Sequence, residues 1–190
     1  MKTIALLFGL LFTTDLIPHL GGEGLLISGP TEKKRIVFYA DSTILLPLGG
    51  NTWAQNIPAR TKIITNNGIE NWTNAQVSFN TYFRVDKPGS IKIKLKAKTD
   101  GQSDLQLEII GVKKALTIKG SDFQLYDAGE WILRDTGYIK IVLTGISKTG
   151  DRYADVSEYD ISGSAINSKT AFVKNNEGNF FYWGRRGPSV

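Results

Sequence analysis

Hydrophobic and polar residues alternate strictly in two neighbouring stretches of the chain, "SIKIKLKAK" (90–98) and "SDLQLEII" (103–110). In the first stretch every second residue is a lysine, and the residues between the lysines are apolar. A period of two places successive side chains on opposite faces of a β-strand. The pattern therefore predicts two strands that each have one buried and one solvated face. The predicted inward residues are Ile91, Ile93, Leu95, Ala97, Leu105, Leu107 and Ile109.

The turn "TDGQS" (99–103) would set the register if these two strands paired with each other. A two-residue turn at Asp100-Gly101 would place each outward lysine opposite an inward leucine and bury its charge, so it is excluded. A loop of three or five residues keeps the lysines outside. The pairs that it predicts are Lys98–Asp104, Lys96–Gln106, Lys94–Glu108, Leu95–Leu107 and Ile93–Ile109. The lysines then form a solvated sheet face with cross-strand partners, each pair contributing about 0.2–1 kcal/mol, and not a binding stripe.

Short strand-like segments continue along the chain, separated by Gly, Asp, Asn and Ser turns. They lie at 35–40, 42–48, 61–65, 76–85, 114–118, 123–127, 130–134, 137–146 and 153–163. In the segment 137–146, Ile139, Ile141 and Leu143 are predicted to point inward. Two polar segments, 49–56 and 66–76, are predicted as loops. No amphipathic helical segment interrupts the series, which predicts an all-β, antiparallel sandwich or barrel of about eight to ten strands.

The first 22 residues have the features of a secretory signal peptide. Lys2 gives a positive start, and an apolar run follows from Ile4 to Phe12, which is too short to span a bilayer. The alternative is a buried N-terminal strand or helix. We expect a signal peptide at 1–22, a linker at 23–34, and a protein that is secreted, periplasmic or on the cell surface, without a membrane span.

Length and charge limit the classes of partner. A chain of 190 residues is long enough for one well-buried domain, and the absence of Cys excludes disulfides and thiol chemistry. The formal net charge is +5, and removal of 1–22 leaves it unchanged because Lys2 and Asp15 are lost together. Lysines along the body are interleaved with acids, so we expect no nucleic-acid partner.

Catalytic chemistry has few candidate residues. The single histidine is His19 in the predicted signal peptide, which excludes Ser-His-Asp and Cys-His sites and the usual zinc ligand sets. The densest carboxylate group is Asp151, Asp155, Glu158 and Asp160. On a regular strand Asp155 and Asp160 face opposite sides, whereas Glu158 and Asp160 share a side, which is only weak support for a catalytic pair. A Ca²⁺ ion could use one of these Asp residues with backbone carbonyls, and the alternative is a set of ordinary surface carboxylates.

Two Asn-bearing loops and a later turn combine aromatic and hydrogen-bonding residues. Aromatic rings stack on the C–H faces of sugars, and Asn, Asp, Lys and Arg bind hydroxyl and carboxylate groups. The candidate ligand-binding residues are Asn51, Trp53, Asn71, Trp72, Lys148, Asp151, Arg152 and Tyr153. The alternative for each Trp is that it covers an end of the core.

Several motifs together resemble a known family: "LPLGGNTW", "GIENWTN", "FNTYFRVDKPG", "GISKTGDRYADVSEYDISG" and "FYWGRRGPSV". Residues 42–165 are similar to the secreted bacterial domain of unknown function 5077, and the last motif is similar to the start of the domain of unknown function 3472. The resemblance implies a jelly-roll β-sandwich of the galactose-binding or carbohydrate-binding-module type. It implies no catalytic residue, and suggests a structural calcium ion at Asp155 or Asp160 as the only cofactor.

We therefore expect a β-sandwich domain at 35–165, followed at 166–190 by a linker and the truncated start of a second domain. The leading hypothesis is a secreted, non-catalytic accessory module that binds glycan. One alternative is an interaction module that packs on a C-terminal domain of the same parent chain, which would explain the aromatic segment "NFFYWGRRGPSV" (179–190). A carboxylate-based enzyme acting on glycosides is the third hypothesis.

Overall fold

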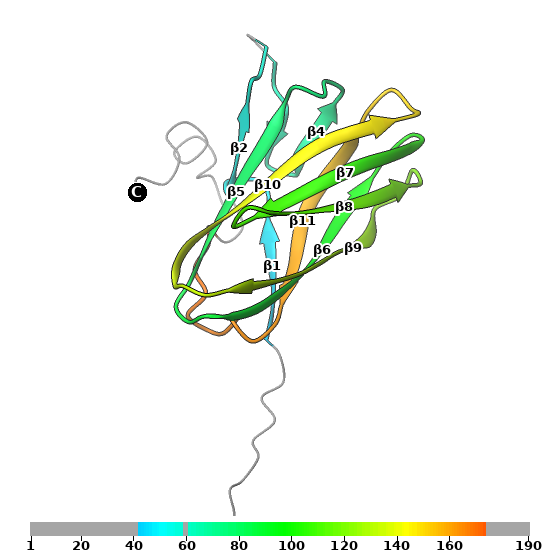
Figure 1. Ribbon diagram of the computed structural model, residues 1–190. Coiled ribbons are helices and arrows are strands. Elements are labelled where there is room, and N and C mark those ends of the chain that lie inside the picture. Colours follow the sequence, from blue (N-terminus) through cyan, green and yellow to red (C-terminus); the bar gives the residue numbers. More distant parts are fainter. Residues whose placement is uncertain (1–41, 59–60, 174–190) are drawn as a thin grey trace, which may run out of the picture. The chain divides into compact units, whose positions relative to one another are not determined.

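The computed structural model describes residues 42–58 and 61–173, all within the compact unit Tyr39–Val190. The strands in this part of the chain form two antiparallel sheets that pack face to face (Figure 1), and the described residues contain no helix. The predicted all-β, antiparallel sandwich of jelly-roll type is therefore confirmed.

Several predicted features lie outside the described residues. They are the signal peptide at 1–22, the linker at 23–34, the strand at 35–40 and the aromatic segment from Phe180 to Trp183. For the same reason, the assignment of the chain's ends to a leader and a second domain stays a prediction.

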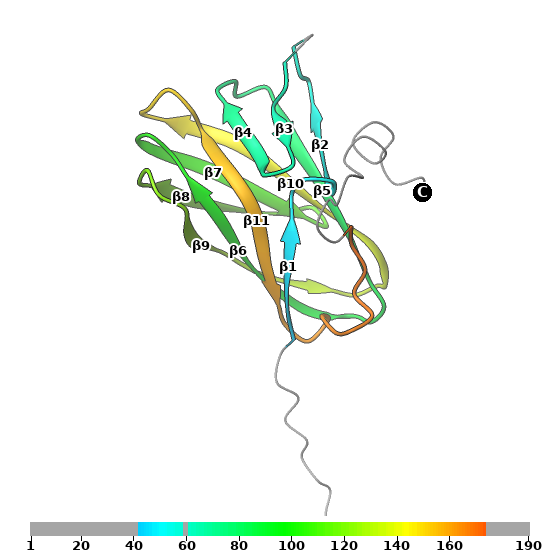
Figure 2. The ribbon, with the colours of Figure 1, turned by 180° about the vertical axis from the view of Figure 1, so that it is seen from behind.

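One sheet has six strands and lies in front in Figure 2. Its order is β3-β4-β11-β6-β9, and β1 also pairs with β11, on the edge that β11 does not share with β6. Its strands are β1 (Thr43–Pro47), β3 (Ile64–Thr65), β4 (Gly68–Trp72), β6 (Gly89–Lys98), β9 (Gln124–Leu133) and β11 (Ala154–Ser162).

The other sheet has five strands in the order β2-β5-β10-β7-β8 and lies in front in Figure 1. Its strands are β2 (Thr52–Gln55), β5 (Ser78–Val85), β7 (Gln102–Ile109), β8 (Val112–Lys119) and β10 (Gly137–Lys148). Strands that are adjacent in sequence therefore often lie in opposite sheets, as Greek-key connections require.

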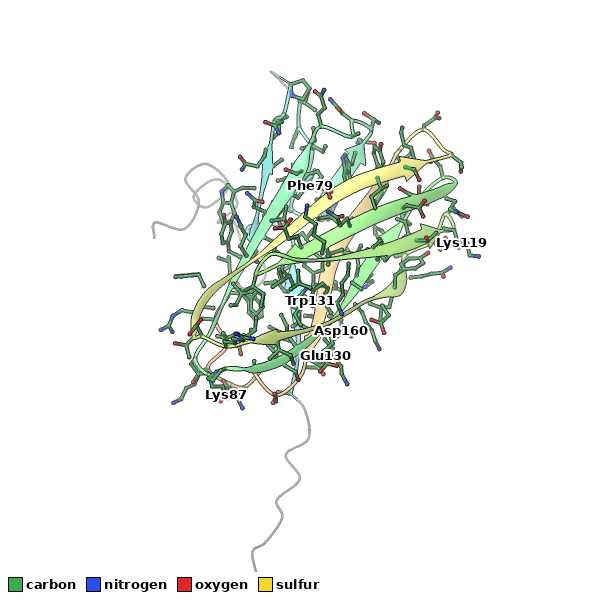
Figure 3. All side chains as sticks on the ribbon, in the orientation of Figure 1. Phe79, Lys87, Lys119, Glu130, Trp131 and Asp160 are labelled. Carbon is green, nitrogen blue, oxygen red and sulfur yellow. The ribbon has the colours of Figure 1, made fainter. Side chains whose placement is uncertain are left out.

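Alternate residues of the central strands form the core between the sheets. All of the predicted inward residues are buried, namely Ile91, Ile93, Leu95, Ala97, Leu105, Leu107, Ile109, Ile139, Ile141 and Leu143. Figure 3 shows Phe79 inside the sandwich and Lys87 and Lys119 at opposite ends of it. Because full burial of a Leu, Ile or Phe side chain contributes about 1.5–3 kcal/mol, this core is the main source of stability.

The predicted pairing of the two alternating strands is wrong, because β6 and β7 belong to different sheets. β6 pairs with β11 and β9, whereas β7 pairs with β10 and β8. Alternation identifies the buried face of a strand but carries no information on which strand lies beside it. The turn at Asp100 and Gly101 therefore crosses from one sheet to the other and does not close a hairpin.

The lysines of β6 nevertheless have acidic cross-strand partners on a solvated face. Along β11 the pairs are Lys98–Asp155, Lys96–Glu158 and Lys94–Asp160, and along β9 they are Lys94–Asp127 and Lys92–Glu130. The Nζ of Lys96 lies 2.8 Å from Oε1 of Glu158. The interpretation of a paired, solvated face is thus confirmed, with partners other than those predicted.

An irregularity in β11 changes which carboxylates share a face. The register against β6 shifts between Val156 and Glu158, as at a β-bulge. Asp155 and Asp160 consequently both pair with outward lysines and lie on the same face. Their predicted placement on opposite faces is wrong, because the extra residue breaks the period of two.

The two segments predicted as loops each contain a strand. β2 lies within 49–56, and β4 within 66–76, where it forms a hairpin with β3 closed by Asn66 and Asn67. Conversely, the predicted strands at 123–127 and 130–134 join into the single strand β9, with a register shift opposite Ile93 and Lys94 that accommodates the break.

The chain after β11 remains attached to the sandwich for several residues. Ala171 exchanges two backbone hydrogen bonds with Arg84 of β5, at 2.8 and 2.9 Å. The segment 166–173, which the sequence assigns to a linker, therefore packs as a short additional edge beside β5. Within the described residues, no helix is long and apolar enough to cross a membrane.

Candidate functional site

An aromatic cleft lies on the outer face of the five-stranded sheet, where β2, β5 and β10 meet the segment 171–173. Its volume is about 370 Å³, within the usual range for small-molecule sites. The residues whose side chains define it are Trp53, Tyr82, Arg84, Tyr138 and Phe172. We call this feature the aromatic cleft.

Strand alternation brings these side chains to one face. Along β5, Phe79, Thr81 and Phe83 are buried in the core, so Tyr82 and Arg84 point outward. In the neighbouring strands Trp53 pairs with Asn80, and Tyr138 pairs with Arg84. Since directly paired residues of antiparallel strands project to the same side, all of these side chains share the outer face.

Trp53 and Tyr82 form the centre of the aromatic cleft. Their ring centroids lie 5.5 Å apart, with an angle of 66° between the ring planes. This edge-to-face arrangement fixes the rings relative to each other while both side chains stay partly exposed. The two rings thus present a rigid apolar surface to a ligand.

Asn51 holds the wall of the cleft that the segment 171–173 forms. Its Nδ2 donates to the carbonyls of Pro47 (2.8 Å) and Val173 (2.9 Å), and its Oδ1 accepts from the backbone N–H of Val173 (2.8 Å). The residue is only 2% exposed. Its amide is therefore committed to the protein, and Asn51 positions the wall of the site without offering its amide to a ligand.

The charges around the aromatic cleft are of one sign. Arg84 is the sole ionisable side chain other than Tyr among the described residues that line it, and Lys140 pairs with Tyr82 on the same face. Both cations are exposed. Neither forms an ion pair with another residue in the described part of the chain.

The other predicted ligand-binding residues lie at the end of the sandwich near the start of β11, where Asn71 and Asp151 are exposed. Trp72 is fully buried and donates its indole N–H to the carbonyl of Asn74. Its ring meets Phe79 edge to face, with 4.9 Å between the ring centroids, and lies at a tilt beside Tyr153, with 5.1 Å between the centroids. Tyr153 is 6% exposed. These two rings cover the end of the core, as the alternative interpretation held, and their faces are not available to a sugar.

The polar residues at this end bind one another. Arg152 donates to Asp155 at 3.0 Å and to Asp100 at 3.3 Å, and the nearby Asp155 carboxylate raises the pKa of the guanidinium. Lys148 lies over the ring of Tyr153 and donates to the backbone carbonyl of Asp151. The network therefore stabilises the loop after β10.

The predicted metal residues do not form a shared site. Asp155 is 6% exposed, and its carboxylate accepts hydrogen bonds from Arg152 and from the backbone N–H of Asn71, the latter at 2.9 Å. Asp160 is five residues further along β11, about 15 Å in an extended strand, where it pairs with Lys94. Among the described residues no group of three or more His, Cys, Asp or Glu side chains is placed to hold a metal ion. A calcium ion held by one of these Asp residues with backbone carbonyls stays a prediction.

The relationship of the chain to known proteins is decided by a family model. The model of a domain of unknown function, DUF5077, matches residues 46–166. The chain belongs to the DUF5077 family. This confirms the part of the resemblance that concerned this domain, whereas a following domain of the other family stays a prediction. No curated protein matches the chain in sequence.

The DUF5077 domain is similar in fold to carbohydrate-active proteins of known structure. A β-(1,4)-mannanase from Podospora anserina, described as GH26-CBM35, matches with a TM-score of 0.50 and 11% identity, over 68% of this chain and 29% of the mannanase. The CBM36-1 domain of a xylanase from the hindgut metagenome of Trinervitermes trinervoides has a TM-score of 0.44 and 14% identity, covering 66% of this chain and 100% of that module. A CBM36 module in complex with calcium and xylotriose has a TM-score of 0.40 and 15% identity, covering 64% and 99%.

These likenesses concern the fold alone, because the identities are low. This chain spans less than a third of the mannanase. The residues that would bind a ligand in the DUF5077 domain therefore have to be taken from its own geometry.

Part of the aromatic cleft is recognisable from the sequence, and part is not. Trp53 and Asn51 were singled out, but they were assigned to an end loop and not to a sheet face. Tyr82, Arg84 and Tyr138 were missed. The signal was present in "SFNTYFRV", where alternation places Tyr82 and Arg84 outward, and an aromatic residue beside an arginine on a solvated face marks a binding surface.

A larger cleft of about 840 Å³ lies between the free edges of β8 and β9. It contains Trp131, which lies between the two sheets in Figure 3. Trp131 is 2% exposed, donates its indole N–H to the carbonyl of Val112 at 3.0 Å, and has Lys114 Nζ 5.1 Å from its ring centroid. Because the ring of Trp131 is covered in this way, it offers no open face to a ligand in this cleft. Tyr138 lines both clefts.

Proposed function

We propose that this DUF5077 domain is a secreted, non-catalytic accessory module that binds carbohydrate in the aromatic cleft. The observation that carries the proposal is the rigid, partly exposed pair of Trp53 and Tyr82 on the sheet face. Such rings stack on the C–H faces of sugars, and the hydroxyls of Tyr82 and Tyr138 and the guanidinium of Arg84 supply directional hydrogen bonds.

The lining of the cleft supports binding without catalysis. Hydrolysis of a glycosidic bond by the common mechanisms needs two carboxyl groups on either side of it. Among the described residues that line the aromatic cleft there is neither Asp nor Glu. Of the four carboxylates considered from sequence, Asp155 is bound to Arg152 and Glu158 to Lys96, at the other sheet.

Secretion is part of the same proposal and rests on the leader-like residues 1–22. A secreted, periplasmic or cell-surface location would bring the module into contact with extracellular glycans.

Affinity electrophoresis tests this function. The full chain is run through native gels that each contain one soluble polysaccharide, and a retarded migration identifies a ligand. Trp53→Ala and Tyr82→Ala are expected to weaken that binding by about tenfold each, because each removes one ring surface.

Phe123→Ala is the matched control, since Phe123 is 43% exposed and lies outside the residues that line the aromatic cleft. It removes an exposed ring of similar size and should leave the retardation unchanged. Circular dichroism checks that the variants are folded. Failure of every polysaccharide to retard the wild-type chain, or equal retardation of the Trp53→Ala variant, would overturn the proposal.

A second candidate is an interaction module that packs on a C-terminal domain of the parent chain. The observation in its favour is that the described chain reaches the rim of the aromatic cleft at Val173, fixed there by Asn51, and that residues 174–190 follow. In that case extension of the chain by its downstream sequence should raise the melting temperature and protect the amides of β2 and β5 from hydrogen exchange. An extended chain with unchanged exchange would exclude packing on this face.

A further inference from the structure

The positively charged side chains on the outer faces of the sandwich differ in whether an acidic residue is paired with them. On the six-stranded sheet every outward lysine of β6 stands opposite at least one acidic residue, with Lys96 and Glu158 in contact at 2.8 Å. On the five-stranded sheet, Lys113 of β8 lies 3.7 Å from Glu108 of β7. The cations beside the aromatic cleft form no such contact.

Arg84 and Lys140 lie next to the aromatic rings, and neither is paired with an acidic residue on a neighbouring strand. Arg84 pairs with Tyr138, and Lys140 pairs with Tyr82, so each cation stands directly beside a tyrosine on the outer face. Neither forms an ion pair or a side-chain hydrogen bond with any described residue. The aromatic cleft thus combines two partly exposed rings with two cations that form no ion pair with the described residues.

We propose that the aromatic cleft selects anionic saccharides, which carry carboxylate or sulfate groups. This inference rests on the proposed function and specifies its ligand class. The rings of Trp53 and Tyr82 would contact the sugar, Arg84 would bind the anionic group through two parallel N–H···O bonds, and Lys140 would act as a second point charge.

The backbone around Arg84 is suited to this role. Its N–H and carbonyl both bond to Ala171, while its other side pairs with Tyr138 in β10. The backbone of Arg84 is thus held between β10 and Ala171 of the same chain, and its exposed side chain projects from a fixed point beside the rings. A rigidly based guanidinium loses less freedom on binding than one on a loop.

The test compares ligands that differ only in charge. The full chain is titrated with polygalacturonate and with its fully methyl-esterified form, and with dextran sulfate and unmodified dextran. We expect the chain to bind the charged member of at least one pair, and to bind its neutral partner with an affinity about tenfold lower or less. The affinity for the charged member should fall as the salt concentration is raised. The first pair reports on carboxylate and the second on sulfate as the group recognised.

Two double variants separate site-specific recognition from net charge. Arg84→Gln with Lys140→Gln removes two positive charges at the cleft, and Lys92→Gln with Lys94→Gln removes two from the opposite sheet. The first variant should lose about tenfold or more in affinity for the charged ligand, and the second should lose much less. A single Arg84→Lys variant keeps the positive charge but loses the two parallel N–H donors of the guanidinium. Its affinity for the charged ligand should lie between those of the wild type and the first variant.

The outcomes also separate this inference from the function on which it rests. Equal affinity for charged and neutral members, with loss in the Trp53→Ala variant, would overturn selection for anions and leave glycan binding in place. Equal losses in the two double variants would show that binding follows net charge, which also overturns it. Absence of binding to all four polysaccharides and to the wider gel series would overturn the proposed function itself.

Discussion

At the scale of single residues, Asn51 joins three parts of the chain through one side chain. It lies between β1 and β2 and bonds to Pro47 and to both backbone groups of Val173. Because it is buried, replacement of its amide removes hydrogen bonds that water replaces only poorly. Asn51 therefore links the stability of the fold to the wall of the aromatic cleft.

We predict that Asn51→Ala lowers the free energy of unfolding by about 1–3 kcal/mol. The variant should also increase hydrogen exchange of the amide of Val173, which loses its acceptor. Urea denaturation and exchange measured by mass spectrometry check both effects.

Asn67→Ala is the matched control, since Asn67 is an exposed turn residue whose side chain makes one bond, at 3.3 Å to Glu70. Its effect should stay within about 0.5 kcal/mol. An Asn51→Ala variant as stable as this control would show that the segment 171–173 is held by other contacts.

At the scale of elements, the β3–β4 hairpin depends on a glycine that lies against β11. Gly68 has a φ of 118°, and a Cβ added there would lie 2.1 Å from the carbonyl oxygen of Val156. Both the backbone conformation and the close approach to β11 therefore require glycine. The contact lies at the register irregularity of β11 and fixes the edge of the six-stranded sheet.

Gly68→Ala should destabilise the domain more than Gly111→Ala, and urea denaturation compares the two. Gly111 also has a positive φ, of 80°, but a Cβ there would meet nothing within 4 Å. In the Gly111→Ala variant only the strained backbone conformation lowers the free energy of unfolding, by about 1–2 kcal/mol. Equal losses would show that β11 yields to accommodate a methyl group at position 68.

The β-strands illustrate what a sequence determines and what it leaves open. Alternation predicted the buried faces of β6, β7 and β10 correctly, because burial acts on each strand separately. It could not predict that β6 and β7 lie in different sheets, since both arrangements bury the same residues. The register irregularity in β11 could not be predicted either, because one extra residue in a strand does not change its composition recognisably.

The candidate site follows the same division. Trp53 was recognisable from its residue type, whereas its partners Tyr82 and Tyr138 come from strands far away in sequence. Only the strand order β2-β5-β10 brings them together. Trp72 could not be separated from Trp53 by sequence, because an Asn closely precedes each of them in a polar segment. In the structure Trp72 is fully buried, whereas Trp53 is partly exposed.

At the scale of the whole molecule, we expect stability that does not depend on calcium. The carboxylate of Asp155 already binds Arg152, and Asp160 is paired with Lys94 on the neighbouring strand, so we expect neither to need a metal ion for charge balance. The melting temperature of the full chain should be the same in excess EDTA and in excess CaCl₂. A calcium-dependent rise that Asp155→Asn or Asp160→Asn abolishes would contradict this expectation.

The attachment of residues 171–173 beside the aromatic cleft also has a mechanical consequence. A force applied to the chain beyond Val173 would act first on its bonds to Asn51 and on the two bonds between Ala171 and Arg84. These few bonds would separate before the sheets, which are held by long ladders and the core. Tension on that side would therefore open the wall of the cleft while the sandwich stays folded. A ligand bound there would be released when the chain is pulled and retained when no force acts on it.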